Sequence, residues 1–510
     1  MKQIKLLPQF LNLIQQWRPC FADYRTHGRA VGFALSLLVC LGRRTISRAI
    51  CAQQRQFQSW ASDYKLFSLS RWSPRSLFDV VLKLALALVS KTQPVVIALD
   101  DTITRKTGHR IPNASTLRDP LSPAYHTNLV WALRFIQAVL LICPIDGVGA
   151  ARAIPIAFNL APPVPKPKKK KASNTTSADT NDKSDANVKK VGKKTTDPER
   201  KQYYQMRRQQ GLSAQGALLI QQIRSRLDAM ADFAQRILWV VVDASYCNLT
   251  VLSRLPERTV LIGRTRKDIH LSALPEAQSG RGRRRSYGKD LGTPEQMRKD
   301  DSIPWQRASI FAAGRSHQLR YKSVGPVLWR RGAQRRPLRL IIIAPLAYHA
   351  HGHRLYRQPA YLLVTDPNAD VVQVLQAYFY RWEVEVDQKD EKDLLGVGQA
   401  QVWSKQAVSH QPAFHVASYA MLLLAAIQCF GLNSTTALPP LPHWRIRKPP
   451  LRLSAAQLIA RLRSELELLD SSHSSAGRPP SSDFPRALLE KQIGMKIPVT
   501  MRAILDSAWT

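Results

Sequence analysis

The chain has 510 residues, too many for one ordinary hydrophobic core, so we expect two to four domains. Its 45% hydrophobic and 22% charged content is that of a globular protein and excludes a disordered or fibrous chain. Lys and Arg number 75 against 36 Asp and Glu, and this formal charge of +39 favours nucleic acid over an anionic membrane as the partner. The six cysteines form no C-x-x-C pair, which argues against a zinc module or a disulfide framework.

Residues 1–90 have apolar residues at helical spacing, notably in 34–42 and 76–91, and predict a helical DNA-binding domain. Between these segments Thr45 is placed to cap a short basic helix carrying Arg43, Arg44 and Arg48. A basic helix after a tight turn suits the DNA major groove. An ordinary solvated helix face explains the same residues equally well.

From residue 91 the pattern becomes that of an α/β core. Residues 94–101 predict a strand ending in Asp100 and Asp101, and residues 128–142 predict one long strand or two paired ones. Residues 91–161 then form the first part of the core. A Lys-rich stretch at 162–200, low in apolar residues, predicts a disordered insert.

The core resumes at 201–265, where we expect a helix over about 213–234, a strand at 237–245 containing Asp243, and a strand at 258–263. Residues 266–340 are rich in Arg and broken by Gly and Pro, and predict a β-rich insertion. Residues 341–435 form the third part of the core, with a strand at 361–366 and a long helix from about Val371 into the 390s. The apolar run 416–432 is predicted as a buried helix, and 436–510 as a tail or a dimerisation region.

Two acids at strand ends, joined by one from a neighbouring helix, could hold two divalent cations for an in-line phosphoryl displacement. Magnesium suits such an oxygen-only site. On spacing alone, however, Asp100 or Asp243 is more commonly a helix cap or a turn residue.

The predicted helix after Val371 carries Tyr378, Arg381, Glu385 and Lys392 at offsets 0, 3, 7 and 14. At ~100° per residue these four fall within about 60° of arc, on one helix face. A carboxylate flanked by two cations and a phenol suits a metal together with a phosphate. A solvated face carrying ion pairs at helical spacing is the alternative reading.

The string Y-x2-R-x3-E-x6-K formed by these four residues resembles the signature of the insertion-sequence-four group of bacterial DDE transposases. The stretch ALDDTITRKTG (98–108) resembles the D-D-T first motif of one branch, and VVVDASY (240–246) resembles the second motif, a strand ending in D-x-x-Y. The resemblance covers roughly residues 30 to 430 and keeps the order of the parts.

This resemblance implies a ribonuclease-H-like (retroviral-integrase-like) α/β fold interrupted by a β-rich insertion. It assigns catalysis and metal binding to Asp100, Asp243 and Glu385, with Asp101 as a competing ligand because adjacent strand residues point to opposite faces. Two Mg²⁺ ions, with Mn²⁺ as a substitute, are the expected cofactors. Tyr378, Arg381 and Lys392 are expected to contact DNA.

The predicted function is that of a DNA transposase, which hydrolyses phosphodiesters at transposon ends and transfers the strands into target DNA. Its partners would be double-stranded DNA and a second copy of the chain in a synaptic complex, without a membrane, in the bacterial cytoplasm at the nucleoid. A ribonuclease-H-like nuclease without strand transfer and a non-catalytic DNA-binding derivative are the alternatives. Only the detection of strand-transfer products separates the transposase from the nuclease.

Overall fold

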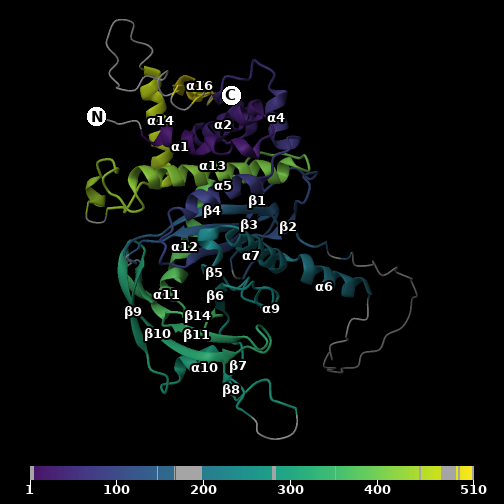
Figure 1. Cartoon of the computed structure of the whole chain (residues 1–510), viewed down its shortest axis with the longest axis vertical. Helices are drawn as coiled ribbons and strands as arrows, with labels where there is room; N and C mark the ends of the chain where they lie inside the picture. Colours follow the sequence, from purple (N-terminus) through teal and green to yellow (C-terminus); the bar gives the residue numbers. More distant parts are fainter. Residues whose placement is uncertain are drawn as a thin grey trace, which may run out of the picture.

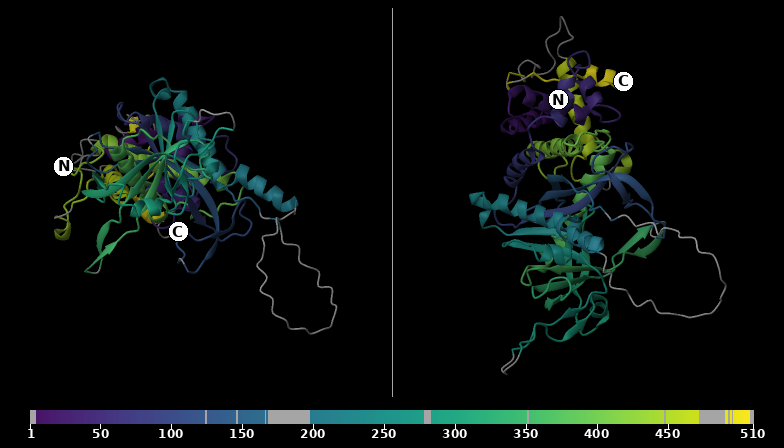
Figure 2. Two further views of the ribbon diagram at one scale, coloured as in Figure 1. Left: turned by 90° about the horizontal axis from the view of Figure 1, so that it is seen from below. Right: turned by 90° about the vertical axis from the view of Figure 1, so that its right-hand side faces the viewer.

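A computed structural model describes residues 5–507 apart from 124, 146, 166, 168–197, 278–282, 351, 447–448, 472–489, 492–493 and 495. Helices gather at one end of the molecule, a large mixed sheet lies in the middle, and a β-rich region forms the other end (Figure 1). Both termini lie at the helical end (Figure 2).

Five strands form the part of the sheet that corresponds to the predicted core. Their spatial order is β4-β3-β1-β5-β6, in which β3 runs antiparallel to β1 and β4, whereas β5 and β6 run parallel to β1. This order and this pattern of directions fit a ribonuclease-H-like α/β fold. The strands are β1 (Val95–Arg105), β3 (Leu129–Ile142), β4 (Arg152–Leu160), β5 (Leu238–Val242) and β6 (Thr259–Thr265), with the short β2 (Ser115–Arg118) beside β3.

Alternate residues of β1 and β5 belong to two different hydrophobic clusters, one on each face of the sheet. Ile97 and Leu99 pack into the cluster shared with α5 (Pro74–Leu86), α7 (Leu212–Asp228) and α13 (Ala407–Phe430). Ala98 and Val241 pack on the opposite face with α11 (Val371–Tyr380) and the start of α12 (Trp382–Asp393). Strand alternation therefore assigns Asp100 and Asp243 to the face that α11 and α12 cover.

The helices of residues 1–90 share one hydrophobic core with helices from the end of the chain. Glu465 of α14 (Ala455–Ser471) accepts hydrogen bonds from the backbone N–H groups of Leu6 and Leu7 and so closes the start of α1. The helices of this layer are α1 (Leu6–Gln15), α2 (Tyr24–Val39), α3 (Ile46–Ala52), α4 (Ala61–Ser68), α5, α13, α14 and α16 (Met501–Ser507), with the 3₁₀ turns Arg18–Cys20 and His443–Arg445.

Helix α13 contains most of the apolar run predicted as a core helix. By length and composition alone it could cross a membrane, the one such helix among the residues that the structure describes. Its most apolar stretch is 83% buried inside the protein, as in a core helix.

The Arg-rich insertion extends the central sheet. Strand β14 (Ala360–Val364) pairs antiparallel with β6, and β11 (Pro337–Ile343) and then β10 (Arg315–Leu328) follow it outward. The other elements of this region are β7 (Leu271–Ser272), β8 (Asp290–Gly292), α10 (Pro294–Lys299), β9 (Gln306–Ala312) and the hairpin of β12 (Ala347–Ala350) and β13 (His353–Tyr356).

Some expected boundaries differ from the structure. The helix expected over 213–234 ends at Asp228, and the separate turn α8 (Ala231–Ala234) follows it; α9 (Leu249–Leu252) lies between β5 and β6. Strand β4 was not predicted from the sequence. Most of the Lys-rich stretch 162–200 lies outside the described residues, but its last three positions are already the start of α6 (Pro198–Gln210).

Candidate active site

Asp100 and Asp243 lie side by side because of the register between two parallel strands. Leu99 of β1 pairs with Val242 of β5, and the residue that follows each of them is an aspartate. The sequence predicted that Asp100 lies at the end of a strand. In the structure it lies inside β1, because β1 continues to Arg105 along its antiparallel partner β3. It is β5 that ends here, and neighbouring strands are only ~4.8 Å apart.

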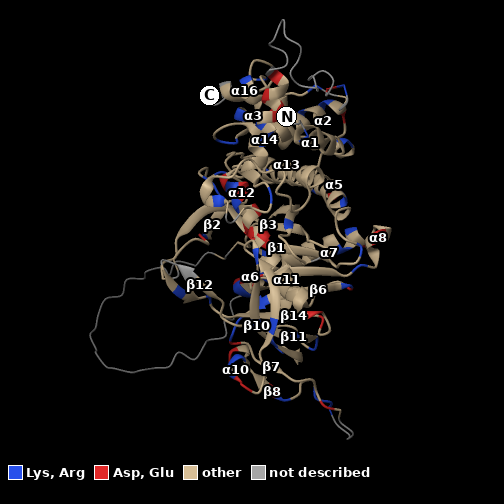
Figure 3. Ribbon diagram, turned by 90° about the vertical axis from the view of Figure 1, so that its left-hand side faces the viewer, with Lys and Arg blue, Asp and Glu red and all other residues tan. Residues whose placement is uncertain are grey.

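Glu385 on α12 reaches the same place through Arg381. Arg381 Nη2 donates to Glu385 Oε1 at 2.8 Å, and Arg381 Nη1 lies 3.5 Å from Asp100 Oδ2. The guanidinium is buried, with its side chain 13% exposed. The break between α11 and α12 falls at Arg381, which keeps helical dihedral angles, so both helices still present one continuous face. Figure 3 shows acidic residues beside the labels of β1 and α12 in the middle of the molecule.

The electrostatics of Asp100 indicate a carboxylate that lacks enough positive charge. The pKa of Asp100 is raised to about 7, first by burial and then by the negative charge of Asp243, while Arg381 opposes both effects. Asp243 itself accepts hydrogen bonds from the backbone N–H of Ser245 at 2.9 Å and from its hydroxyl at 3.1 Å. These two bonds fix the Asp243 side chain at the end of β5.

Asp101 points to a different set of partners. Its Oδ2 lies 3.5 Å from Nε of Arg134 on β3, and burial raises its pKa while Arg134 lowers it. Tyr246 is fully buried close to these acids: burial raises the pKa of its phenol, as do the charges of Asp101, Asp100 and Asp243. Gly216 of α7 leaves room for that ring, since a Cβ there would lie 2.6 Å from a Tyr246 ring carbon. Of the two adjacent aspartates, it is Asp100 that shares Arg381 with Glu385.

Tyr378 and Lys392 complete the predicted face of the helix. Burial raises the pKa of Tyr378, whose neighbours include the charges of Arg264, Arg381 and Glu385. Burial lowers the pKa of Lys392, and the charges of Asp100 and Asp101 oppose that change. The four residues expected on one face therefore all lie around the acids of β1 and β5.

A divalent cation fits the donor chemistry of this place. Among the residues that the structure describes, no three His, Cys, Asp or Glu side chains stand close enough together to hold one metal ion as they are. The adjacent carboxylates of Asp100 and Asp243 repel each other, and the raised pKa of Asp100 shows that Arg381 does not compensate them. Oxygen ligands with unbalanced negative charge are what Mg²⁺ binds.

A second set of acids on α12, missed in the sequence, has partners other than Arg381. Glu383, Asp387 and Glu391 recur every four residues, a spacing that was visible in the sequence as an acidic stripe. Burial raises the pKa of Glu391 to about 8, and that of Asp387 well above its usual range. Gln137 of β3 donates to Glu391 at 2.6 Å, and Arg452 donates to Glu383 at 2.7 Å.

The basic residues predicted to enter a DNA groove lie at a different part of the molecule. Thr45 caps α3 as expected, accepting from the backbone N–H of Arg48 at 3.3 Å. Arg43 and Arg44, however, precede the helix, which is only seven residues long and packs against α2 and α16. Arg43 is exposed, whereas Arg44 and Arg48 are half-buried, and burial lowers the pKa of Arg44. A DNA contact by these three residues stays a prediction.

Comparison with known proteins assigns the chain to a family. The family described as DDE superfamily endonuclease matches residues 16–336, which include Asp100 and Asp243 and end before Glu385. No curated protein matches the chain. Because the matched residues form more than half of the chain and contain the paired aspartates, the chain belongs to the family of DDE superfamily endonucleases.

Proposed function

We propose that the chain is a cut-and-paste DNA transposase of the insertion-sequence-four-like group. The observation that carries this proposal is that Arg381 contacts both Asp100 and Glu385, while the strand register puts Asp243 beside Asp100. Family membership supports an endonuclease or transposase type of activity with DNA as substrate, and members of the superfamily generally use divalent metals. Strand transfer into target DNA goes beyond what family membership supports and is part of our proposal.

Each residue has a role in this proposal. Asp100, Asp243 and Glu385 would hold divalent cations, Mg²⁺ or its substitute Mn²⁺, which supply charge stabilisation at the attacking and leaving oxygens. Arg381 and Lys392 would bind phosphate oxygens of the transposon end, and Tyr378 would limit where the backbone can lie. Asp243 would be held in position by Ser245, and Asp100 by the sheet itself.

Two ends of an element must be cut and joined together, so we propose a homodimer for the synaptic complex. A cytoplasmic, nucleoid-associated location in a bacterial cell follows from the same function. The charge of +39 would support binding to both element ends and target DNA.

The test is a cleavage and strand-transfer assay with DNA carrying the element's own ends. We expect Glu385→Gln to lose cleavage by roughly 10³-fold or more while DNA binding is kept, because it removes a metal ligand but no positive charge. Asp393→Asn is the matched control, since Asp393 is exposed at the end of the same helix. Cleavage without joined products would instead indicate a nuclease. Wild-type cleavage by Glu385→Gln would overturn the assignment of the site.

A further inference from the structure

A hollow of about 780 Å³ opens directly beside Asp243. Its lining begins at Ala244, the next residue after Asp243, and at Arg264 of β6, whose charge reaches Tyr378. From there it runs to α10 and to the base of the β12–β13 hairpin, where Arg357 lines it. The hollow thus leads from the candidate active site into the β-rich insertion.

Three residues that line this hollow form a hydrogen-bonded group in which the charges of Arg298 and Glu295 cancel. Arg298 donates to both oxygens of Glu295, at 2.7 and 2.9 Å, and the Tyr361 hydroxyl also donates to Glu295. These bonds hold the pKa of Glu295 down at about 2. Arg298 is therefore occupied by Glu295 and contributes no net positive charge to a ligand.

The rim of the hollow differs from this group, because three of its cations have no carboxylate partner. Arg264, Lys267 and Arg357 are exposed and form no ion pair within the described residues, whereas Arg266 between them is paired with Asp268 at 3.2 Å. The Arg357 guanidinium lies only over the Tyr348 ring, at 5.7 Å. Three cations without an ion pair, along a hollow whose lining includes the residue next to Asp243, suit a chain of phosphates.

We propose that this hollow binds the phosphodiester backbone of the DNA strand that runs away from the scissile bond, held by Arg264, Lys267 and Arg357. The proposal rests on the proposed function for the identity of the nearby chemistry. Arg264 lies nearest the acids, so it would bind the first phosphate, and Lys267 and Arg357 would bind those that follow.

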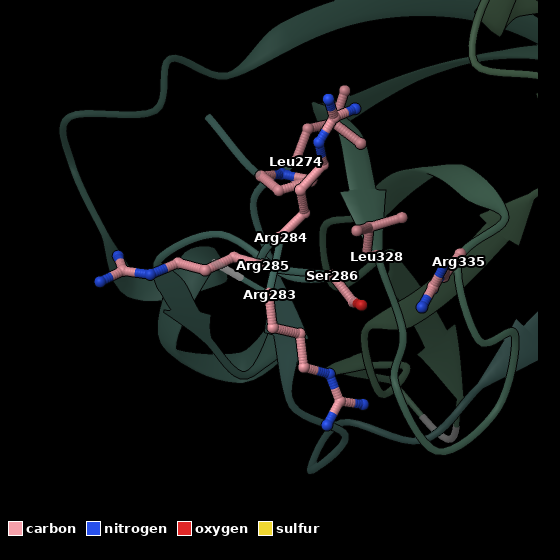
Figure 4. Close-up of a pocket in the computed structure, with 8 residues that line it drawn as sticks. Leu274, Arg283, Arg284, Arg285, Ser286, Leu328 and Arg335 are labelled. Carbon is pink, nitrogen blue, oxygen red and sulfur yellow. The ribbon is translucent and has the colours of Figure 1, made fainter. Parts of the chain in front are cut away.

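A second, smaller hollow of about 380 Å³ makes a useful contrast. It lies among residues of the insertion, and Figure 4 shows Arg283, Arg284 and Arg285 pointing in three different directions around it. None of its lining residues is adjacent in the chain to an acid of the candidate site, whereas Ala244 in the lining of the larger hollow directly follows Asp243.

The experiment measures how the affinity for a duplex carrying the element end depends on salt, in EDTA so that no cutting occurs. Each lost phosphate contact reduces the slope of log K against log salt by about 0.9. We expect the triple variant Arg264→Ala, Lys267→Ala, Arg357→Ala to reduce the slope by about 2 to 3. Its matched control is Lys91→Ala, Lys405→Ala, Arg445→Ala, which removes the same charge from exposed residues outside the hollow and outside residues 1–90.

Position is tested with Lys267→Cys, whose thiolate we expect to displace bromide from a bromoacetamide arm attached to a phosphorothioate next to the scissile bond, and not from arms attached at distant phosphorothioates. A triple variant whose slope equals that of the control, or cross-links spread along the duplex, would overturn the proposal. Both measurements are binding measurements, so they stay readable even if the wild-type protein cuts no DNA. Conversely, normal cleavage with an unchanged slope would reject the hollow alone and leave the proposed function intact.

Discussion

Arg381 and Glu385 are joined across one helical turn by a 2.8 Å hydrogen bond, and the same guanidinium lies 3.5 Å from Asp100. One buried cation therefore connects the acid of α12 with the acid of β1. Arg381 Nε and Nη1 are buried and have no hydrogen-bond partner among the described residues, and Asp100 still has a raised pKa. The arrangement brings negative charges together with too little positive charge, which suits a protein that takes up a divalent cation.

The first prediction follows from that imbalance. Without metal at pH 8, Asp243→Asn should raise the free energy of unfolding by about 1 kcal/mol, since it removes repulsion from Asp100. Arg381→Gln should lower it, because Asp100 and Glu385 lose the buried cation that they share. Chemical denaturation in EDTA measures both.

The pH dependence of that effect has a definite sign. The pKa of Asp100 is raised from 3.8 to about 7, so the folded state holds a proton there that the unfolded state loses. The benefit of Asp243→Asn should be complete above about pH 7 and absent below pH 4. Mg²⁺ should raise the melting temperature of the wild type and of the Asp393→Asn control, and much less that of Asp243→Asn. Equal shifts in all three proteins would contradict this reading of the site.

A second prediction concerns how α12 is held in place from behind. Arg452 donates to Glu383 at 2.7 Å and to the backbone oxygen of Ala151 at 2.9 Å, so it ties α12 to the start of β4. Arg452→Met should cost about 2–3 kcal/mol, because it leaves Glu383 half-buried without its cation. Glu383→Gln should cost less, since Arg452 keeps its backbone acceptor.

Cleavage should also decrease in Arg452→Met, with the loss in kcat rather than in KM, because Glu385 moves with the helix. The double variant with Glu383→Gln should be more stable than the sum of the two single changes requires, with a coupling of about 1–3 kcal/mol. Additive single effects would show that the pair does not position α12.

The sequence predicted most of the core strands and which four side chains share one helix face, for an identifiable reason. Short β-branched runs such as 94–101 and 238–242 form strands wherever they are buried, and four side chains on one helix face stay together whatever the tertiary fold. The sequence could not choose between Asp100 and Asp101. That choice depends on the pairing of Leu99 with Val242 and on which face α11 covers, and both are tertiary facts.

Other features depended on packing that no local pattern encodes. The segment that becomes β4 contains Pro155, which weakens a strand prediction, yet its residues 152–158 are buried and α13 and α5 pack against it. The buried stripe Glu383, Asp387, Glu391 looks like a solvated helix face until β3 and Arg452 are placed against it. The helices of residues 1–90 suggested a separate unit, whereas they share their core with α13 and α14.

A third prediction is an acid-sensitive step in the core of the helical layer. His415 of α13 is fully buried, and burial lowers its pKa from 6.5 to about 3, with the charge of Arg44 adding to the effect. The unfolded state therefore binds a proton below pH 6.5 that the folded state does not, so stability falls as the pH falls. Between pH 8 and pH 5 this one residue should remove about 2 kcal/mol.

His415→Gln should remove that part of the pH dependence, whatever its effect on stability at pH 8. His126→Gln is the matched control, because His126 is exposed. Urea denaturation at several pH values measures the slope. An unchanged slope in His415→Gln would contradict this prediction, because it would mean that His415 takes up its proton over the same pH range in the folded and the unfolded protein.

The last prediction concerns the turn that follows α12. Lys106, next to the end of β1, donates to the backbone oxygens of Gly398 at 2.8 Å and Ala400 at 3.0 Å, so it fastens this turn to the sheet that carries Asp100. Gly398 has a φ of +93°, and a Cβ there would lie 2.6 Å from Cβ of Thr104. Gly398→Ala should therefore cost about 2–4 kcal/mol, from strain and from overlap.

Gly147→Ala is the matched control, since Gly147 also has a positive φ of +70° but open space around it, and should cost only about 1 kcal/mol. Because the displaced turn follows α12 directly, Gly398→Ala should lose cleavage at temperatures where it is still folded, and Gly147→Ala should not. Equal costs for the two alanines would show that the contact with Thr104 does not constrain the turn.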